Sequence, residues 1–198
     1  MSGPGEIWLA TANTKKRLEL ERILAPLGIA IRTRAITVAE DAPDFAGNAR
    51  QKATALALQV AAPALGDDSG LCVDALHGAP GVHSARYAGP GRTDQERNAK
   101  LLRELAQVPA TQRGARFVCS ICLADAAGNV LAAFEETCEG TLLMAARGDH
   151  GFGYDPLFVP REIPDKTFAE LSPDEKDRVS HRGKALRRLV SYLRDRRQ

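Results

Sequence analysis

The sequence lacks any long hydrophobic run, and this absence limits the classes of protein that it can encode. No stretch approaches the roughly 18 consecutive apolar residues that a membrane-spanning helix requires. The N-terminal segment also lacks a basic region followed by an apolar run, which is the pattern of an export signal. We therefore expect a cytoplasmic protein with no membrane partner.

An excess of either charge is also missing. The chain has 27 basic and 25 acidic residues, a formal net charge of +2, so it offers no general attraction to nucleic acid. Internal repeats, linkers and low-complexity tracts are absent as well. With 198 residues, the chain can bury about 70% of the surface that its unfolded form exposes. We therefore expect no nucleic-acid partner and a single domain over residues 1–198.

The few cysteines do not form a metal or redox motif. Cys119 and Cys122 have a suitable spacing, but Ala115–Asp125 has the pattern of a strand, in which residues three apart face opposite sides. No second pair completes a zinc site. We interpret the thiols as small buried side chains in a reducing compartment. They are Cys72, Cys119, Cys122 and Cys138.

What the sequence does contain is a pair of adjacent acids, Asp67 and Asp68, within Gly66–Gly70. We interpret this segment as a strand end that carries the acids into a turn. Neighbouring carboxylates repel each other when both are ionised and partly buried, so a cation is expected to compensate them. Mg²⁺ is usually bound by one or two carboxylates plus substrate phosphates, which suggests phosphate chemistry. The alternative is an exposed turn, because Asp, Ser and Gly are common in turns.

A strand, a polar loop and a helix open the chain. Ile7–Ala10 is apolar, Thr11–Lys16 is polar, and leucines at helical spacing follow. Free N–H groups and the positive end of a helix dipole bind anions, so the loop favours a phosphate cradle. The glycine and lysine spacing of a P-loop is absent. An ordinary capped helix with solvated lysines is the alternative.

A second glycine-rich segment, Gly148–Pro156, interleaves glycines with Phe152, Tyr154 and Asp155. This composition suits a flat ligand that the backbone approaches closely, although the aromatic rings could instead pack in the core. The other expected elements are a strand at 29–35, a helix from Phe45 until Pro63, helices beginning at capping boxes 93–96 and 172–175, a hairpin around 125–129 and a closing amphipathic helix.

Four blocks of the sequence together resemble the inosine triphosphate pyrophosphatase family, whose members are non-canonical purine nucleoside triphosphate pyrophosphatases. Each block alone is a weak signal, but their order and spacing from Leu9 to about Leu193 are jointly specific. The blocks are Thr11–Lys16, Asp67–Leu71 continuing into Gly78–Tyr87, Gly151–Pro156, and Ser180–Gly183.

The resemblance implies a fold and an activity. The fold is an elongated, two-lobed α/β domain with a mixed sheet flanked by helices and a central cleft, commonly in a homodimer. The activity is Mg²⁺-dependent hydrolysis of ITP, dITP and XTP to the monophosphate and pyrophosphate. A purine nucleoside triphosphate is therefore the expected substrate.

The resemblance also assigns roles to individual residues. Asp68 becomes a metal-binding general base, with Glu40 and Asp67 as metal-side acids. From the residues alone, Lys52 is a lysine that extends to solvent and Glu40 a loop acid, whereas the resemblance makes Lys52 a phosphate ligand. The substrate-binding residues that it implies are Thr11, Ala12, Asn13, Thr14, Lys15, Lys16, Lys52 and Ser69, with Phe152, Gly153, Tyr154, Asp155, Lys176, His181 and Arg182 around the base.

Two other functions remain open at this point. A related nucleotide pyrophosphatase could act on modified or pyrimidine nucleotides, because the metal and phosphate groups would serve both substrates. A nucleotide- or RNA-binding protein without turnover is disfavoured, because Asp67 and Asp68 would repel a phosphate backbone. Departures from the family pattern are Ala12 and Gly47, where Gly and Glu are usual, and Asp149-His150 in place of small residues.

Overall fold

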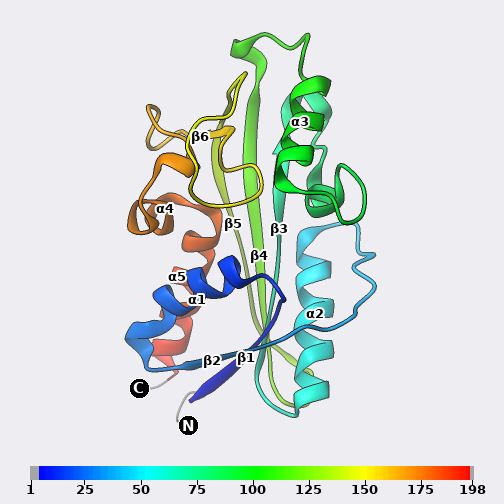
Figure 1. Ribbon diagram of the computed structural model, residues 1–198. Helices are drawn as coiled ribbons and strands as arrows, with labels where there is room; N and C mark the ends of the chain where they lie inside the picture. Colours follow the sequence, from blue (N-terminus) through cyan, green and yellow to red (C-terminus); the bar gives the residue numbers. More distant parts are fainter. Residues whose placement is uncertain (1–4, 197–198) are drawn as a thin grey trace. The chain divides into compact units, whose positions relative to one another are not determined.

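The computed structural model describes residues 5–196, which form a six-stranded mixed sheet with helices packed against it (Figure 1). The strand order is β2-β1-β3-β4-β5-β6; β1 is parallel to β2 and β3, and β5 is antiparallel to β6. The α/β class is therefore confirmed. The strands are β1 (Glu6–Ala10), β2 (Ala30–Arg34), β3 (Ala64–Val73), β4 (Gly114–Ala124), β5 (Val130–Leu142) and β6 (Phe158–Pro160).

The helices begin and end where local signals place them. Thr93 and Ser172 each complete a capping box, as expected, and Asp44 caps the helix that starts at Phe45. The α-helices are α1 (Thr14–Leu24), α2 (Phe45–Val60), α3 (Asp94–Glu104), α4 (Pro173–Val179) and α5 (His181–Asp195). Short 3₁₀ turns are η1 (Ala25–Leu27), η2 (Asp74–Leu76), η3 (Gly81–Arg86), η4 (Ala110–Gln112) and η5 (Phe168–Glu170).

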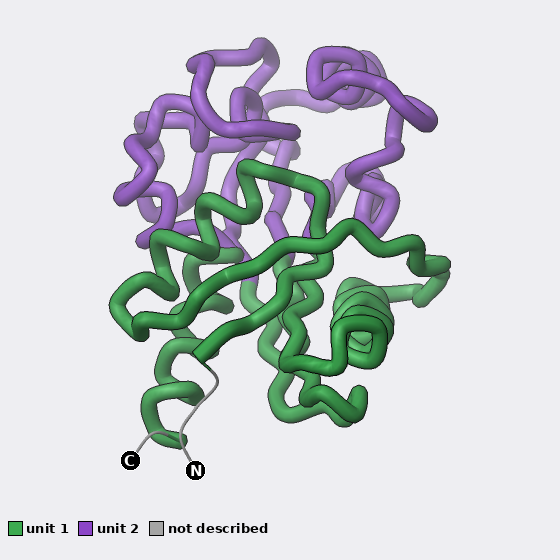
Figure 2. The backbone as a smooth tube through the Cα atoms, turned by 60° about the horizontal axis from the view of Figure 1, so that its bottom comes forward, with its two compact units in different colours: residues 1–68, 119–136, 182–198 green, residues 69–118, 137–181 purple. Residues whose placement is uncertain are grey.

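The described residues divide into two compact units (Figure 2). Unit 1 takes its residues from the ranges 1–68, 119–136 and 182–198, and unit 2 from 69–118 and 137–181. Strands β3, β4 and β5 each contribute residues to both units. A single domain over the whole chain stays a prediction.

Unit 1 has an apolar core on each face of its strands. On one face, α1 and α5 pack their leucines against β1, β3 and β4, and Cys119 lies in this cluster. On the other face, the alanines of α2 pack beside Cys122. The two cysteines therefore face opposite sides, as the strand pattern predicts. The close approach of α2 explains Gly66, since a Cβ there would lie 2.0 Å from the Ala49 carbonyl oxygen.

Unit 2 is built around a separate core to which α3, β3, β4, β5 and β6 each contribute residues. Phe117, Phe158 and Phe168 form an aromatic group, with ring centroids 4.8 to 5.7 Å apart. Arg113 is also buried in this unit and donates to three backbone carbonyl oxygens, those of Leu105, Val108 and Leu143. These bonds tie the residue before β4 to the turn that follows α3 and to the end of β5.

One sequence expectation is wrong. Gly66–Gly70 is the interior of β3, not a strand end that leads into a turn. The apolar residues on both sides of the acids are fully buried, so the extended backbone continues through the acidic pair to Val73. Turn propensity is overridden here by burial and by ion pairs from distant parts of the chain.

No helix within residues 5–196 combines the length and the apolar character needed to cross a membrane.

Candidate functional site

Asp67 and Asp68 are neighbours in β3, and this position separates their side chains. Successive side chains of a strand point to opposite faces of the sheet. Each carboxylate accordingly has its own set of partners in unit 1, as described below, and both side chains are buried. Lys16 and Arg182 pair with Asp67 and Lys52 pairs with Asp68, and the Lys16 charge acts on both carboxylates.

The Asp67 carboxylate is enclosed by cations. Arg182 donates from Nε to its Oδ2 at 2.9 Å, and the Lys16 ammonium forms an ion pair with its Oδ1. The Arg182 guanidinium also contacts Glu19 at 2.6 Å, and the Cys119 thiol lies 3.4 Å from Asp67 Oδ2. Burial raises the pKa of Asp67, but the charges of Arg182 and Lys16 outweigh burial and hold this pKa well below its ordinary value. Two ion pairs thus favour the ionised form of the Asp67 carboxylate.

The Asp68 carboxylate has a different environment on the opposite face. The Lys52 ammonium contacts Asp68 Oδ1 at 2.7 Å and Glu40 Oε2 at 3.1 Å. Asn48, on the same helix α2, donates to Asp68 Oδ2 at 3.2 Å. Burial raises the pKa of Asp68 above its ordinary value, and the nearby Lys52 charge does not fully offset this effect. A higher pKa makes this carboxylate a stronger proton acceptor.

Lys52 is a buried cation between two acids, not a lysine that extends to solvent. Its side chain is 11% exposed, whereas the residues alone favour a solvated ammonium. Burial lowers the pKa of Lys52, but the charges of Asp68 and Glu40 raise it above the ordinary value. The ammonium therefore stays charged and joins Glu40, which has a left-handed backbone (φ 44°), to Asp68.

The residues around Lys52 fit a hard divalent cation. Asp68 and Glu40 both reach the same ammonium, so their oxygens converge on one region of unit 1. Two carboxylates are sufficient for Mg²⁺, which completes its coordination with water and substrate phosphate. The structure does not bring Asp67 to this pair, because its oxygens face Lys16 and Arg182. Within residues 5–196, no group of three or more His, Cys, Asp or Glu side chains forms a metal site by itself.

The loop before α1 has the geometry of a capped helix start. Asn13 Oδ1 accepts from the backbone N–H groups of Lys15 and Lys16 at 2.9 and 3.2 Å. Thr11 Oγ1 in turn accepts from Asn13 N at 3.0 Å. This geometry supports the alternative of an ordinary cap, and the role of this loop in phosphate binding stays a prediction.

In unit 2, the glycine-rich loop is joined to α4 through Asp155 and Lys176. Both side chains are buried, and the Lys176 ammonium contacts Asp155 Oδ2 at 2.7 Å. The same oxygen accepts from Phe152 N at 2.7 Å. Lys176 Nζ also lies 4.7 Å from the centre of the Phe152 ring. The structure therefore brings three of the predicted base-side residues into one cluster.

His181 and Arg182 are adjacent in sequence, but they have different partners. The His181 ring stacks on Phe117 in unit 2, with centroids 4.7 Å apart and an angle of 8° between the planes. The Arg182 guanidinium is held by Asp67 and Glu19 in unit 1. Tyr154 is buried and donates to the Ser84 carbonyl at 3.0 Å, whereas Ser69 is half-buried in β3. Their roles in base binding stay predictions.

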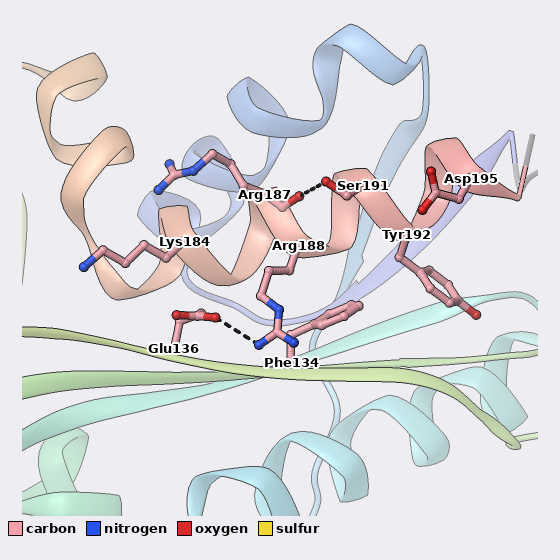
Figure 3. A pocket seen from close by; sticks show the side chains of 8 residues that line it. All are labelled: Phe134, Glu136, Lys184, Arg187, Arg188, Ser191, Tyr192 and Asp195. Carbon is pink, nitrogen blue, oxygen red and sulfur yellow. Dashed lines mark hydrogen bonds and ion pairs between the residues drawn. The ribbon is translucent and has the colours of Figure 1, made fainter.

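A surface pocket on unit 1 contains none of these residues (Figure 3). It lies between α5 and β5, where Arg188 contacts Glu136 at 2.9 Å and lies over the Phe134 ring. The pocket therefore does not belong to the candidate site. Its lining residues are Phe134, Glu136, Lys184, Arg187, Arg188, Ser191, Tyr192 and Asp195.

Sequence reasoning missed two residues that hold the acids in place. Asn48 connects Asp68 to the loop that carries Glu40, because its Oδ1 also accepts from Ala42 N at 3.1 Å. Glu19 provides the second carboxylate for Arg182. Glu19 has no local motif that marks it, whereas a polar residue such as Asn48 on the apolar side of a helix is a usable signal.

Comparisons with known proteins agree over nearly the whole chain. The model of the Ham1 family matches residues 7–192. The dITP/XTP pyrophosphatase of Gloeobacter violaceus is 51% identical over 185 residues, which cover 92% of this chain and 91% of that protein. The dITP/XTP pyrophosphatase of Geobacillus kaustophilus is 48% identical, with coverage of 93% and 92%.

Solved structures lead to the same group. A HAM1 protein from Coxiella burnetii superposes with a TM-score of 0.82 at 40% identity, and the match covers 96% of this chain and 98% of that one. A family match over most of the sequence and a relative above 50% identity leave a single assignment. The chain belongs to the Ham1 family.

Proposed function

We propose that this protein hydrolyses purine nucleoside triphosphates with unusual bases, such as ITP, dITP and XTP, to the monophosphate and pyrophosphate. The observation that carries the proposal is the buried Asp68 carboxylate, whose pKa is raised and which shares Lys52 with Glu40. The relatives named dITP/XTP pyrophosphatase support the same substrate class. Mg²⁺ as cofactor and a homodimer are part of the proposal, because the family resemblance implies them. A cytoplasmic location is also part of it, as expected from the sequence pattern.

The mechanism requires little covalent chemistry from the protein. Cleavage of a phosphoanhydride needs an in-line water, compensation of charge and positioned donors. Asp68 would accept the proton of the attacking water, and its raised pKa favours this transfer. Lys52 orients Asp68 through the 2.7 Å contact and adds positive charge for phosphate oxygens.

The residues that would bind the metal and the phosphates belong to unit 1. Asp68 and Glu40 would hold Mg²⁺, which when bound offsets charge on the phosphate oxygens. Lys16 and the loop of Thr11, Ala12, Asn13, Thr14 and Lys15 would bind the remaining phosphate oxygens. Asp67 holds the Lys16 ammonium in place through their ion pair, so we assign Asp67 a supporting role and not a metal-binding one.

The residues that would bind the base belong to unit 2. Phe152 would stack on the base, but stacking alone does not distinguish one purine from another. Inosine and xanthosine carry an oxygen acceptor at the six position, where adenine carries an amino donor. Lys176 lies over the Phe152 ring, and His181 stacks on Phe117 in the same unit, so we propose that these two donors favour a six-oxygen. A donor that faces another donor is left unpaired, which lowers affinity for adenine.

A panel of triphosphates tests the proposed substrate class. With Mg²⁺ present, kcat/KM for ITP, dITP and XTP should exceed that for ATP at least about 10²-fold, because a site built for hydrogen bonding rejects a mismatched edge. Release of pyrophosphate is the measurement. Preference for a pyrimidine or modified nucleotide would identify a related pyrophosphatase instead. Tight nucleotide binding without turnover would identify a binding protein.

Replacing Lys52 tests the phosphate side. Lys52→Met keeps the apolar stem and removes the charge, so the affinity for ITP should fall about 10- to 100-fold, since a hydrogen bond to a charged group contributes about 1.5–3 kcal/mol. Affinity for the nucleoside inosine should change little. Calorimetric titration measures both, with the exposed Lys166→Met as the matched control. Equal losses of affinity for ITP and for inosine would show that the change does not act through the phosphates. Lys52 would then be removed from the phosphate site.

A further inference from the structure

The glycine-rich loop is held by helix α3, which no part of the proposed function yet uses. Asp94 Oδ2 accepts from Gly153 N at 2.8 Å, and Asn98 Nδ2 donates to the Gly153 carbonyl at 3.0 Å. Residues four apart in a helix lie on one face, so a single face of α3 contacts both polar groups of Gly153. The N–H belongs to the peptide that joins Phe152 to Gly153, and the carbonyl to the peptide that joins Gly153 to Tyr154.

The backbone at Gly153 needs such support. Its φ of +62° lies in the left-handed region, which glycine adopts without strain but does not select by itself. Two hydrogen bonds from a rigid helix restrict this freedom. The orientation of the Phe152 ring depends on the restricted peptide, because Phe152 directly precedes it.

The two α3 side chains are themselves fixed. Asp94 forms an ion pair with Arg97, and Arg97 Nη1 donates to the Ala85 carbonyl at 3.0 Å. Thr93 caps the helix immediately before Asp94. Asp94 therefore presents its carboxylate from an ordered first turn, where an acid is also favoured by the helix dipole.

Asn98 has a feature that stability alone does not explain. Its side chain is buried, and its Oδ1 has no hydrogen-bond partner among the described residues. A buried acceptor without a partner destabilises a fold, and an apolar side chain of similar size would avoid that cost. The asparagine is therefore accounted for by its bond to Gly153.

The amide group of Phe152 is held independently of α3. Asp155 accepts from Phe152 N and contacts Lys176, which lies over the Phe152 ring. The peptide groups on both sides of Phe152 are thus held, one by Asp155 and the other by α3. We propose that Asp94 and Asn98 are positioning residues that set the orientation of Phe152 for stacking on the purine base. This inference rests on the proposed base-binding role of Phe152.

Asn98→Ala and Asp94→Ala test the inference, with Asp94→Asn and Gln95→Ala as controls. Asp94→Asn keeps an oxygen acceptor for Gly153 N, and Gln95 is an exposed residue of the same helix. Asn98→Ala and Asp94→Ala should each raise KM for ITP about tenfold with a smaller change in kcat. In both controls, KM and kcat should stay within about twofold of wild type. Inhibition by inorganic tripolyphosphate, which has no base, should be unchanged in all four proteins.

A double-variant cycle separates positioning from a general structural effect. In a Phe152→Ala background, Asn98→Ala should cause no further rise in KM, because the two changes act through the same ring. An additive rise, weaker inhibition by tripolyphosphate, or equal effects of Asp94→Ala and Asp94→Asn would overturn the inference. If Asn98→Ala does not fold, the comparison of the two Asp94 variants decides the question by itself.

The same experiment distinguishes failure of the inference from failure of the proposed function. If Phe152→Ala leaves KM for ITP unchanged, the base-binding role of the loop is wrong, and the role of α3 with it. If Phe152→Ala raises KM but the Asp94 and Asn98 variants do not, the inference about α3 alone is wrong.

Discussion

Asp68→Asn is expected to lower the hydrolysis of ITP by about 10²–10⁴-fold, the range that a positioned general base contributes. The amide is the same size as the carboxylate and can still accept from Lys52, so the fold should be retained. It has almost no basicity, however, and it is a weaker metal ligand. Turnover with saturating Mg²⁺ and ITP is the measurement, and nucleotide affinity should fall much less than turnover.

Asp74→Asn is the matched control for this prediction. Asp74 follows the same strand, but its side chain is 62% exposed and pairs with Arg116. Its replacement should leave turnover within about twofold of wild type, as expected for an exposed ion pair. Turnover of Asp68→Asn within about tenfold of wild type would remove Asp68 from the mechanism.

Arg182→Ala is expected to lower the free energy of unfolding by about 3–5 kcal/mol, because removing one partner of a buried ion pair leaves buried charge without compensation. Arg182 contacts Asp67 at 2.9 Å and Glu19 at 2.6 Å, and its side chain is 3% exposed. Urea unfolding of the two proteins measures the difference. Arg188 lies on the same helix, but its side chain is 55% exposed and pairs with Glu136. Arg188→Ala should therefore lower the free energy of unfolding by less than about 1 kcal/mol.

The pH dependence of this loss follows from the pKa of Asp67. In the wild type this pKa is held well below its ordinary value, so the ion pair adds stability above the unfolded pKa and loses it as the pH falls. Without Arg182, the folded pKa of Asp67 rises. The deficit of the variant should therefore be largest near neutral pH and should shrink as the pH falls below about 4, the range in which an ordinary carboxyl is protonated.

A different result for Arg182→Ala would support the role that the family resemblance implies. That role places Arg182 beside the base, where its loss should narrow the ratio of kcat/KM for ITP to that for ATP. A variant that keeps wild-type stability but shows a narrowed ratio would contradict the structural role. Such a result would make Arg182 a selectivity residue.

Local patterns were sufficient to predict most of the elements. The capping boxes at Thr93 and Ser172, the helix that begins at Phe45 and the strand at Ala30–Arg34 all follow from residues close together in sequence. The hairpin expected around 125–129 is followed by a long second strand, Val130–Leu142. Elements of this kind depend on nearby caps and periodicity, which a sequence displays directly.

The acidic segment was mispredicted because its partners are distant in sequence. Asp67 is paired with Lys16, 51 residues away, and with Arg182, 115 residues away. The contact of Asp94 with Gly153 spans 59 residues and has no local signal at all. Local turn propensity was therefore a poor guide at β3, where burial and remote charges decide the backbone conformation.

The identity of the products tests the central claim most directly. Incubation of the wild-type protein with ITP and Mg²⁺, followed by phosphorus NMR, should show IMP and pyrophosphate in equal amounts, with Asp68→Asn as the inactive comparison. Formation of IDP and inorganic phosphate would show attack at the terminal phosphate instead. That result, or an absence of any product, would contradict the proposed pyrophosphohydrolase activity.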